Sequence, residues 1–298
     1  MDADSYKKLY PELFLDTFVK NGVRPDGRTL GKGRAVVVGP GAVNASQGSA
    51  LVRLGHTSVL AGARATLMRP AEGTADEGSL SIEVQFAPFA TPQGGGMTGP
   101  RGPTAELVSA VSERLQASLR PLGIPKQLCI KPGSGAYAVE ADIYVLNADG
   151  AVFDAVLLAA MVMLRDLALP PTKEVTAKEG GGSQAAGPGS VRALTEEEAA
   201  AAGIPPVRLQ LPLQPLAVTC CMYKEHLLVD PTAEEEAVAG STVSVVLDAS
   251  AALHGVYKSG GSLAATPMDF TRCVESAKLR YKELAALVEQ AFAPDADD

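Results

Sequence analysis

Asp149 and Gly150 stand between a strand-like run and a helix-like run, in the stretch NADGAVFDA. Asp-Gly is a strong turn signal, and the backbone N–H groups of a turn that opens a helix can hold an anion such as phosphate. The stretch contains no Lys, Arg, Ser or Thr, the side chains that usually assist those amides. The residues therefore allow two interpretations: an anion site at Gly150 and Ala151, or a turn without a ligand.

A second candidate is the acidic run VDPTAEEE, which supplies carboxylates at Asp230, Glu234, Glu235 and Glu236. Clustered carboxylates can bind Mg²⁺ or serve as a general acid or base. Acidic residues are also typical of a helix N-terminus, where the helix dipole stabilises negative charge. Taken alone, the run favours a helix terminus or a solvated loop over a catalytic site.

Arginines on Gly-rich turns and loops suggest contact with a nucleic-acid backbone. Arg24 and Arg28 flank the turn in RPDGR, and Arg101 lies in the loop GPRGP, with Arg64 and Arg69 between them. Scattered surface arginines fit the same pattern. We predict RNA contacts at Arg101, Arg64 and Arg69, with Arg101 as the first candidate because its Gly/Pro-rich loop leads into a helix.

The composition limits the remaining classes of function. The chain has 298 residues, 46% of them hydrophobic, and a formal net charge of -8, which is typical of a soluble globular protein without a global attraction for nucleic acid or membranes. The longest apolar run, over residues 155–164, is too short to span a bilayer, and the charged N-terminus does not read as a signal peptide. We expect no membrane association, and RNA contact only through a local patch or a surface shared with a partner.

The cysteines and histidines do not form a metal-binding pattern. The four cysteines include no C-x-x-C pair, and the three histidines are far apart, so we expect reduced thiols, no zinc site and no cofactor. P-loop, G-x-S-x-G and H-E-x-x-H motifs are absent from the sequence. The glycines of KPGSGAYAV precede a strand rather than a helix, which excludes a dinucleotide-binding turn.

The first half of the chain reads as strands followed by helices. An amphipathic helix is predicted over 5–20, followed by strands in RAVVVG, GSALVRLG, TSVLAGARA and SIEVQFAPFA. A helix is predicted after an N-cap at Thr104, then a strand over 136–146 and a helix over 154–167 with Asp154 as N-cap. This last helix is apolar on nearly all sides, so we expect it to be buried against a sheet.

The same order restarts after the low-complexity stretch KEGGGSQAAGPGS. Strands are predicted in VRLQLPL, LAVTCCMY, HLLVD and STVSVVLD, followed by a long helix capped by Thr266. Two halves built alike indicate an α+β fold with two related lobes. The predicted division is an N-terminal helical extension (1–23), a first lobe (24–170), a flexible Gly-rich insert or linker (171–204), and a second lobe with a C-terminal helix (205–298).

Several stretches together resemble the ribonuclease PH family. They are RPDGR, GSALVRLGHTSVLAGARA, CIKPGSGAYAVEADIYVLNADGAVFDA and HLLVDPTAEEE, and the resemblance runs from about residue 5 to about residue 290. Within the family, the chain looks most like a ring subunit of the eukaryotic RNA exosome. The resemblance implies the two-lobed ribonuclease PH fold, in which each lobe has β-β-α-β-α order like domain 2 of ribosomal protein S5.

The resemblance also implies partners. Six ribonuclease PH-like subunits form a hexameric ring around a channel for RNA, and three cap subunits of S1/KH type cover it. Active members degrade RNA from the 3′ end with inorganic phosphate as nucleophile. We therefore expect a role in ribosomal RNA maturation and mRNA turnover, in the nucleus with its nucleolus and in the cytoplasm.

The resemblance also implies that the catalytic positions are degenerate in this chain. Active members carry a turn like G-G-T-R where this chain has Asp149 to Phe153, so Phe153 stands at the phosphate-binding arginine. Thr242 stands where a catalytic Asp follows the acidic motif, and Pro103 stands at a second phosphate arginine. We predict a non-catalytic structural subunit. The alternatives are a phosphate-dependent 3′ exoribonuclease, a composite site shared with a neighbouring subunit, and a free-standing homo-oligomeric RNA-binding protein.

Overall fold

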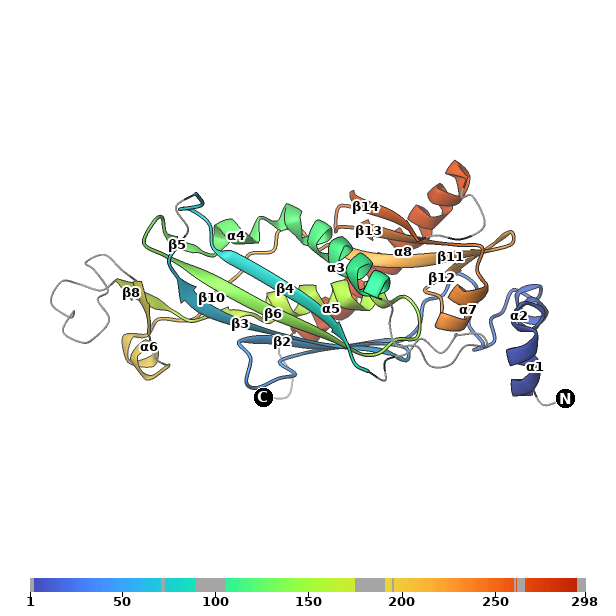
Figure 1. The fold of residues 1–298 in the computed structure, drawn as a ribbon, viewed down its shortest axis with the longest axis horizontal. Coiled ribbons are helices and arrows are strands. Elements are labelled where there is room, and N and C mark those ends of the chain that lie inside the picture. The colour runs from blue at the N-terminus through green and yellow to red at the C-terminus, as the bar shows by residue number, and fades with distance from the viewer. Residues whose placement is uncertain are drawn as a thin grey trace.

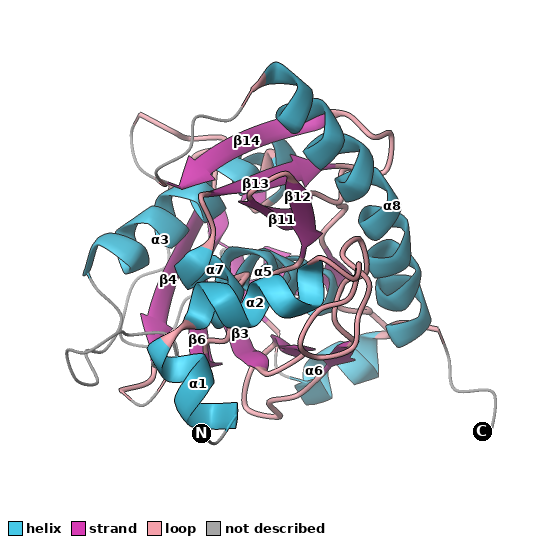
Figure 2. Ribbon diagram, turned by 90° about the vertical axis from the view of Figure 1, so that its right-hand side faces the viewer, coloured by secondary structure: helices cyan, strands magenta, loops and turns pink. Residues whose placement is uncertain are grey.

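Two β-sheets enclose a central helix, α5 (Val152–Asp166), in the computed structural model of the chain (Figure 1). The structure describes residues 3–70, 73–88, 90, 105–174, 191–194, 196–259, 261 and 266–293. Residues 153–164 of α5 are all buried, as its apolar sequence predicts. Figure 2 shows α5 between the two sheets, with α8 (Pro267–Ala291) along one side of the molecule. The predicted α+β class is confirmed.

The first sheet has the strand order β1-β2-β3-β6-β4, with β5 paired to β6. All its pairs are antiparallel except β4 with β6, which is parallel. Helices α3 (Ala105–Leu119) and α5 pack on the face that buries Val59, Ala61 and Ala63. The strands are β1 (Val36–Pro40), β2 (Gly48–Leu54), β3 (Thr57–Met68), β4 (Ser79–Phe86), β5 (Cys129–Lys131) and β6 (Gly135–Asn147).

The second sheet is antiparallel throughout, with the order β12-β11-β13-β14. All eight residues of β11 are buried, because α5 packs on one face of this strand and α8 on the other. One hydrophobic core therefore runs through both lobes. The elements are β11 (Leu216–Tyr223), β12 (His226–Val229), α7 (Ala233–Val238), β13 (Ser241–Leu247) and β14 (Leu253–Ser259).

The strand β14 was missed by the sequence analysis. It is an edge strand, it contains Gly255, and the exposed side chains of Leu253 and Val256 break the alternation expected of a half-buried strand. The predicted strand in VRLQLPL is correct only at β10 (Val207–Arg208), which pairs with β7 (Ala168–Leu169).

The N-terminal extension is two helices rather than the single helix predicted over 5–20. Helix α1 (Ala3–Leu9) ends before Tyr10, and α2 (Pro11–Val19) begins at a proline, which excludes helical backbone from the residue before it. Leu15 of α2 is buried against the second lobe. The pair lies at one end of the molecule (Figure 1).

Within 171–204, predicted as a flexible Gly-rich insert or linker, the described residues form secondary structure. Strand β8 (Thr172–Glu174) pairs antiparallel with β9 (Val191–Ala193), and helix α6 (Glu196–Ala202) follows. The Gly-rich stretch 178–190 lies outside the described residues. Two short helices, η1 (Arg120–Leu122) and α4 (Ile124–Gln127), connect α3 to β5. No helix in the described part of the chain is long and apolar enough to cross a membrane.

Candidate anion site between the lobes

The Asp-Gly turn of the first lobe packs directly on the acidic motif of the second lobe. Gly150 has φ +72, and a Cβ on it would lie 2.4 Å from the carbonyl oxygen of Pro231. The Asp149 carboxylate accepts a hydrogen bond from the backbone N–H of Ala233, at 3.3 Å. Two motifs that are more than 80 residues apart in the sequence therefore form one site.

The backbone N–H of the turn is already bound by a carboxyl group of the same chain. The backbone N–H of Ala151, at the start of α5, donates to Oε1 of Glu236 at 2.8 Å. Burial raises the pKa of Glu236 to about 7, and the negative charges of Asp230 and Asp149 add to the rise. The hydrogen bond from Ala151 and the positive charge of Arg34 act in the opposite direction. The backbone N–H at the predicted anion site is thus occupied by a side chain of the same chain.

The predicted N-cap at Asp154 is wrong. Helix α5 begins at Val152 after Ala151, whose φ of 46° is left-handed, and Asp154 lies inside the first turn. The Asp154 carboxylate instead accepts from the backbone N and from Oγ1 of Thr219 in β11, both at 2.6 Å. Burial raises the pKa of Asp154 to about 7. The sequence alone does not reveal this role of Asp154, because its partner Thr219 belongs to the other lobe.

Asp230 is held by two arginines. Arg34 donates from Nε at 2.9 Å and from Nη2 at 2.6 Å to Oδ1, and its backbone N donates to Oδ2 at 2.6 Å. Nη2 of Arg280, on α8, lies 3.6 Å from Oδ2. Asp230 is only 2% exposed, so its carboxylate is occupied by neighbouring cations rather than available to a substrate.

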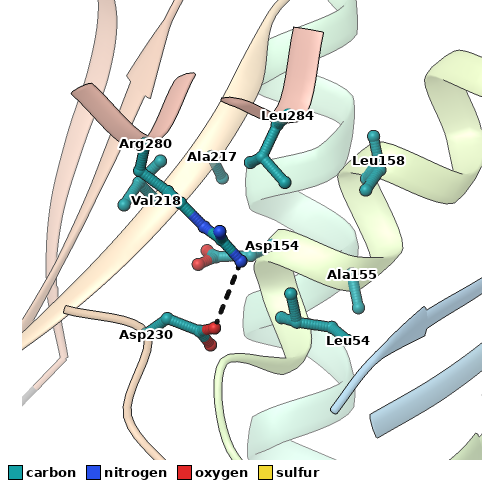
Figure 3. Close-up of a pocket in the computed structure, with 9 residues that line it drawn as sticks. All are labelled: Leu54, Asp154, Ala155, Leu158, Ala217, Val218, Asp230, Arg280 and Leu284. Atoms are coloured by element: carbon teal, nitrogen blue, oxygen red, sulfur yellow. Dashed lines mark ion pairs between the residues drawn. The ribbon is translucent and has the colours of Figure 1, made fainter. Parts of the chain in front are cut away.

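Figure 3 shows Arg280 reaching toward the carboxylate of Asp230, with Asp154 also in view. The three side chains line a small cavity of about 10 Å³, together with apolar residues such as Leu54 and Leu284. A space of this size holds about one water molecule, which is far too small for a nucleotide. The buried charges at this point connect the lobes and do not form a substrate pocket.

Arg34 also links the acidic motif to the turn. Its Nη2 donates to the carbonyl oxygen of Gly150 at 3.2 Å, and its Nη1 lies 3.6 Å from the Asp149 carboxylate. Burial alone would lower the pKa of Arg34, but the carboxylates of Asp230 and Asp149 raise it. Arg34 therefore stays charged where the two lobes meet.

The arginines of RPDGR are structural. Arg24 is fully buried and donates to the carbonyl oxygens of Leu30 and Val229, both at 2.6 Å. It also pairs with Glu235 at 3.4 Å. Arg28 donates to the carbonyl oxygen of Asp230 at 3.2 Å. The interpretation of Arg24 as a phosphate-backbone contact is wrong, because a fully buried guanidinium cannot reach a nucleic acid.

The three glutamates that follow have different partners. Glu235 completes a capping box with Thr232 at the start of α7, as expected for a helix N-terminus. Glu234 is exposed and pairs with Lys7 of α1 at 2.6 Å. Glu236 alone contacts the Asp-Gly turn. The helix-terminus interpretation of the acidic run is confirmed, and no group of His, Cys, Asp or Glu among the described residues could hold a metal ion.

Phe153 packs in the core. It is 4% exposed, and its ring lies edge-on to Tyr257 of β14 with the ring centroids 5.8 Å apart. The guanidinium of Arg114, on α3, lies over the same tyrosine, 5.5 Å from the ring centroid. The position that the resemblance aligns with a phosphate-binding arginine is therefore filled by an apolar ring.

Thr242 lies at the start of β13, opposite Cys221 and Ser259. It shares a sheet face with Ser244, whose hydroxyl is 2.8 Å from Oγ1 of Thr219, so it faces the side on which α5 packs. Its side chain has no acidic group. Pro103 and Arg101 lie outside the described residues.

The other two predicted RNA contacts lie away from the turn. Arg64 is exposed on the outer face of β3, six residues from Ser58 where the strand passes the turn, which is about 20 Å along the strand. Its neighbour across the strand is Glu140, and Asp142 is exposed on the same face. Arg69 is exposed just beyond the end of β3. The structure does not bring Arg64 and Arg69 together with the Asp-Gly turn.

Comparisons with known proteins agree with the two-lobed organisation. Models of the 3′ exoribonuclease family match the chain twice, domain 1 at residues 32–170 and domain 2 at residues 214–280. The curated exosome complex component Rrp42 of Aeropyrum pernix is 29% identical, over 95% of this chain and 94% of its own length. Exosome complex component rrp43 of Schizosaccharomyces pombe is 25% identical, over 93% of this chain and 94% of its own length.

A solved structure described as the Archaeoglobus fulgidus exosome with RNA bound to the active site has the same fold. Its matching chain superposes with a TM-score of 0.69 at 24% sequence identity. The superposition covers 91% of this chain and 97% of that one. The predicted ribonuclease PH fold, with two lobes of mixed helices and strands, is confirmed.

Proposed function

We propose, from the premise that this chain belongs to the 3′ exoribonuclease (RNase PH) family, that it is a non-catalytic structural subunit of an exosome-type ring. Its curated relatives are named exosome complex components, and they match it over nearly its whole length. In this role the chain contributes walls and contacts to an assembly that processes and degrades RNA from the 3′ end.

The observation that supports a non-catalytic role is that side chains of this protein already bind the Asp-Gly turn at Asp149 and Gly150. Phosphorolysis depends on holding phosphate in line with the scissile bond and on stabilising its charge. Here the Ala151 N–H donates to Glu236, and Asp230 is paired with Arg34 and Arg280. The groups that could position phosphate are therefore engaged with each other.

The competing proposal is a phosphate-dependent 3′ exoribonuclease. It would require a cation beside the turn and an acid to protonate the leaving oxygen. The buried ring of Phe153 and the hydroxyl of Thr242 supply neither group at the aligned positions. A milder alternative is a composite site, in which this chain contributes arginines to the active site of a neighbouring subunit.

For partners, we propose other ribonuclease PH-like subunits in a hexameric ring, S1/KH cap subunits above it, and RNA in the channel. The likeness to a chain of an RNA-bound archaeal exosome supports this assembly. Arg101 remains the first candidate for an RNA contact, and Arg101→Glu should weaken RNA binding by the ring without dissociating it. We further propose that the assembly acts in the nucleus with its nucleolus and in the cytoplasm.

The test is nucleoside diphosphate release from RNA in the presence of Mg²⁺ and inorganic phosphate. The chain should show no release above background, either alone or in a ring whose other members are inactive. Mass spectrometry of the native complex purified through a tag on this chain should identify the ring partners. Sustained diphosphate release that disappears in an Asp230 or Arg101 variant would favour the phosphate-dependent 3′ exoribonuclease over the structural subunit. Recovery of the chain as a homo-oligomer would instead favour the free-standing RNA-binding protein.

A further inference from the structure

We infer that Glu236 is an internal occupant of the turn at the start of α5, and that its carboxylate closes this turn to free oxyanions such as inorganic phosphate. The inference rests on the proposed function, because it identifies the residue that keeps the turn without a ligand. It assigns Glu236 a role that none of the other acidic residues of the run has.

The contacts of Glu236 are those of a bound anion. Its Oε1 accepts from the Ala151 N–H, at the positive end of the fifteen-residue helix α5. The positive charge of Arg34 also acts on this carboxylate. A backbone amide, a helix N-terminus and a guanidinium together favour an oxyanion over a neutral group.

The carboxylate is supplied by a helix of the other lobe. Helix α7 packs against the turn through Gly150, where any side chain would collide with Pro231 and Thr232. This close approach brings Glu236 to Ala151. Glu235 and Glu234 cannot replace it, because they are engaged with Arg24 and Lys7.

Keeping the Glu236 carboxylate negatively charged on the turn costs free energy. Asp230 and Asp149 face the same carboxylate and oppose its negative charge, and burial opposes it further. Removal of the Glu236 carboxylate would leave the Ala151 N–H without its acceptor and Arg34 with one fewer anionic neighbour. A phosphate or sulfate ion that enters from solvent would then satisfy both groups.

The experiment compares Glu236→Ala with wild type and with Glu234→Ala, a matched control on the exposed side of the same helix. Thermal unfolding of each full-length protein, with any ring partners that copurify, is followed during titration with inorganic phosphate and with chloride at equal ionic strength. Only Glu236→Ala should show a phosphate-specific rise in Tm, of roughly 3 °C at a tenfold excess over Kd. Glu236→Gln should show no rise, because its amide oxygen still accepts from Ala151.

A phosphate-specific rise of equal size in wild type, or none in Glu236→Ala, would overturn the inference. If Glu236→Ala does not fold, the amide resonance of Ala151 in the wild-type protein gives the answer. That resonance should move with pH as Glu236 titrates and should not move with phosphate, and movement with phosphate would overturn the inference. Nucleoside diphosphate release from RNA is measured separately. If wild type releases no diphosphate and Glu236→Ala does not bind phosphate, this inference alone is overturned. If wild type releases diphosphate, the proposed function is overturned.

Discussion

Arg34 of the first lobe and Asp230 of the second lobe form a buried ion pair in which three nitrogens of the arginine, one of them from its backbone, donate to both carboxylate oxygens. The pair sits where the Asp-Gly turn, the acidic motif and α8 meet. It joins the two lobes beside the turn at Gly150.

Arg34→Ala should therefore be strongly destabilising. The substitution leaves Asp230 buried, and among the described residues Arg280, at 3.6 Å, is its remaining cationic partner. Breaking a buried pair by removing one member costs about 3–5 kcal/mol. Urea unfolding is the measurement, with Arg64→Ala as the control. Arg64 is exposed, so its replacement should change the free energy of unfolding by no more than about 0.5 kcal/mol. Equal effects of the two substitutions would contradict the structural role of the pair.

The buried carboxyl of Asp154 and the half-buried carboxyl of Glu236 should make stability fall as the pH rises. Their pKa values are about 7 in the folded protein, above the value of roughly 4 for unfolded Asp and Glu. Their stabilising effect is fully present below about pH 4 and is lost as the pH rises through 7, because the folded protein binds these protons more tightly.

Asp154→Asn and Glu236→Gln should remove part of this dependence. The stability of each variant relative to wild type should increase between pH 5 and pH 8, measured by chemical unfolding at each pH. Asp76→Asn, an exposed carboxyl on the loop before β4, provides the control and should leave the pH profile unchanged. A relative stability that falls over this range would contradict the raised pKa values of the two groups.

Gly150→Ala should destabilise the fold, because the new methyl group would collide with the backbone of Pro231 and Thr232 at a residue with φ +72. The expected loss is about 3 kcal/mol, from overpacking and backbone strain together. Ala151→Gly tests the neighbouring position, where left-handed backbone already carries a side chain. It should change stability by less than about 1 kcal/mol, since relief of strain and the greater freedom of the unfolded chain have opposite signs. Thermal unfolding distinguishes the two.

Phe153→Arg should fail to create an enzyme. The substitution places a charge in a buried site against Tyr257, without a carboxylate partner among its described contacts. Stability should fall by about 3 kcal/mol or more. Diphosphate release should stay at background, because Thr242 and Pro103 remain and catalytic groups that act as a unit do not contribute additively. Phe153→Leu controls for loss of the ring alone, and turnover by Phe153→Arg in a soluble, folded protein would contradict the prediction.

Tyr223→Phe should loosen the N-terminal helices. The Tyr223 hydroxyl lies 3.0 Å from the carbonyl oxygen of Glu12 and 2.9 Å from the carboxylate of Asp16, so it ties the end of β11 to α2. Its loss should cost about 1 kcal/mol and increase cleavage within residues 3–19 in limited proteolysis. Tyr144→Phe, an exposed tyrosine on β6, should leave the cleavage pattern unchanged.

The sequence predicted the elements whose local pattern matches their burial. The central strands alternate, α5 is apolar all round, and Thr266 caps α8 with a capping box, so each could be recognised without the fold. The break at Tyr10 was equally local and could have been inferred from Pro11. The edge strand β14 carries no such signal, because its exposed side chains do not alternate.

The site itself depends on contacts between the lobes. Three features of the site follow from how the second lobe packs on the first. Arg24 is buried, Asp154 accepts a hydrogen bond from Thr219, and Glu236 rather than Glu235 reaches Ala151. Residue types and spacing indicated which motifs carry charge. They could not indicate which charges would satisfy each other, since the partners are separated by 65 residues or more.

The pairing of β8 with β9 has a practical consequence for anyone who labels this protein. Glu174 and Val191 are register partners, so the chain leaves and re-enters the fold at points about 5 Å apart. The entropy of closing a loop grows only slowly with its length, so the chain between these two residues can be lengthened at little cost. A fluorescent domain whose own ends lie close together could therefore be inserted between Glu174 and Val191, leaving both termini of the subunit unmodified.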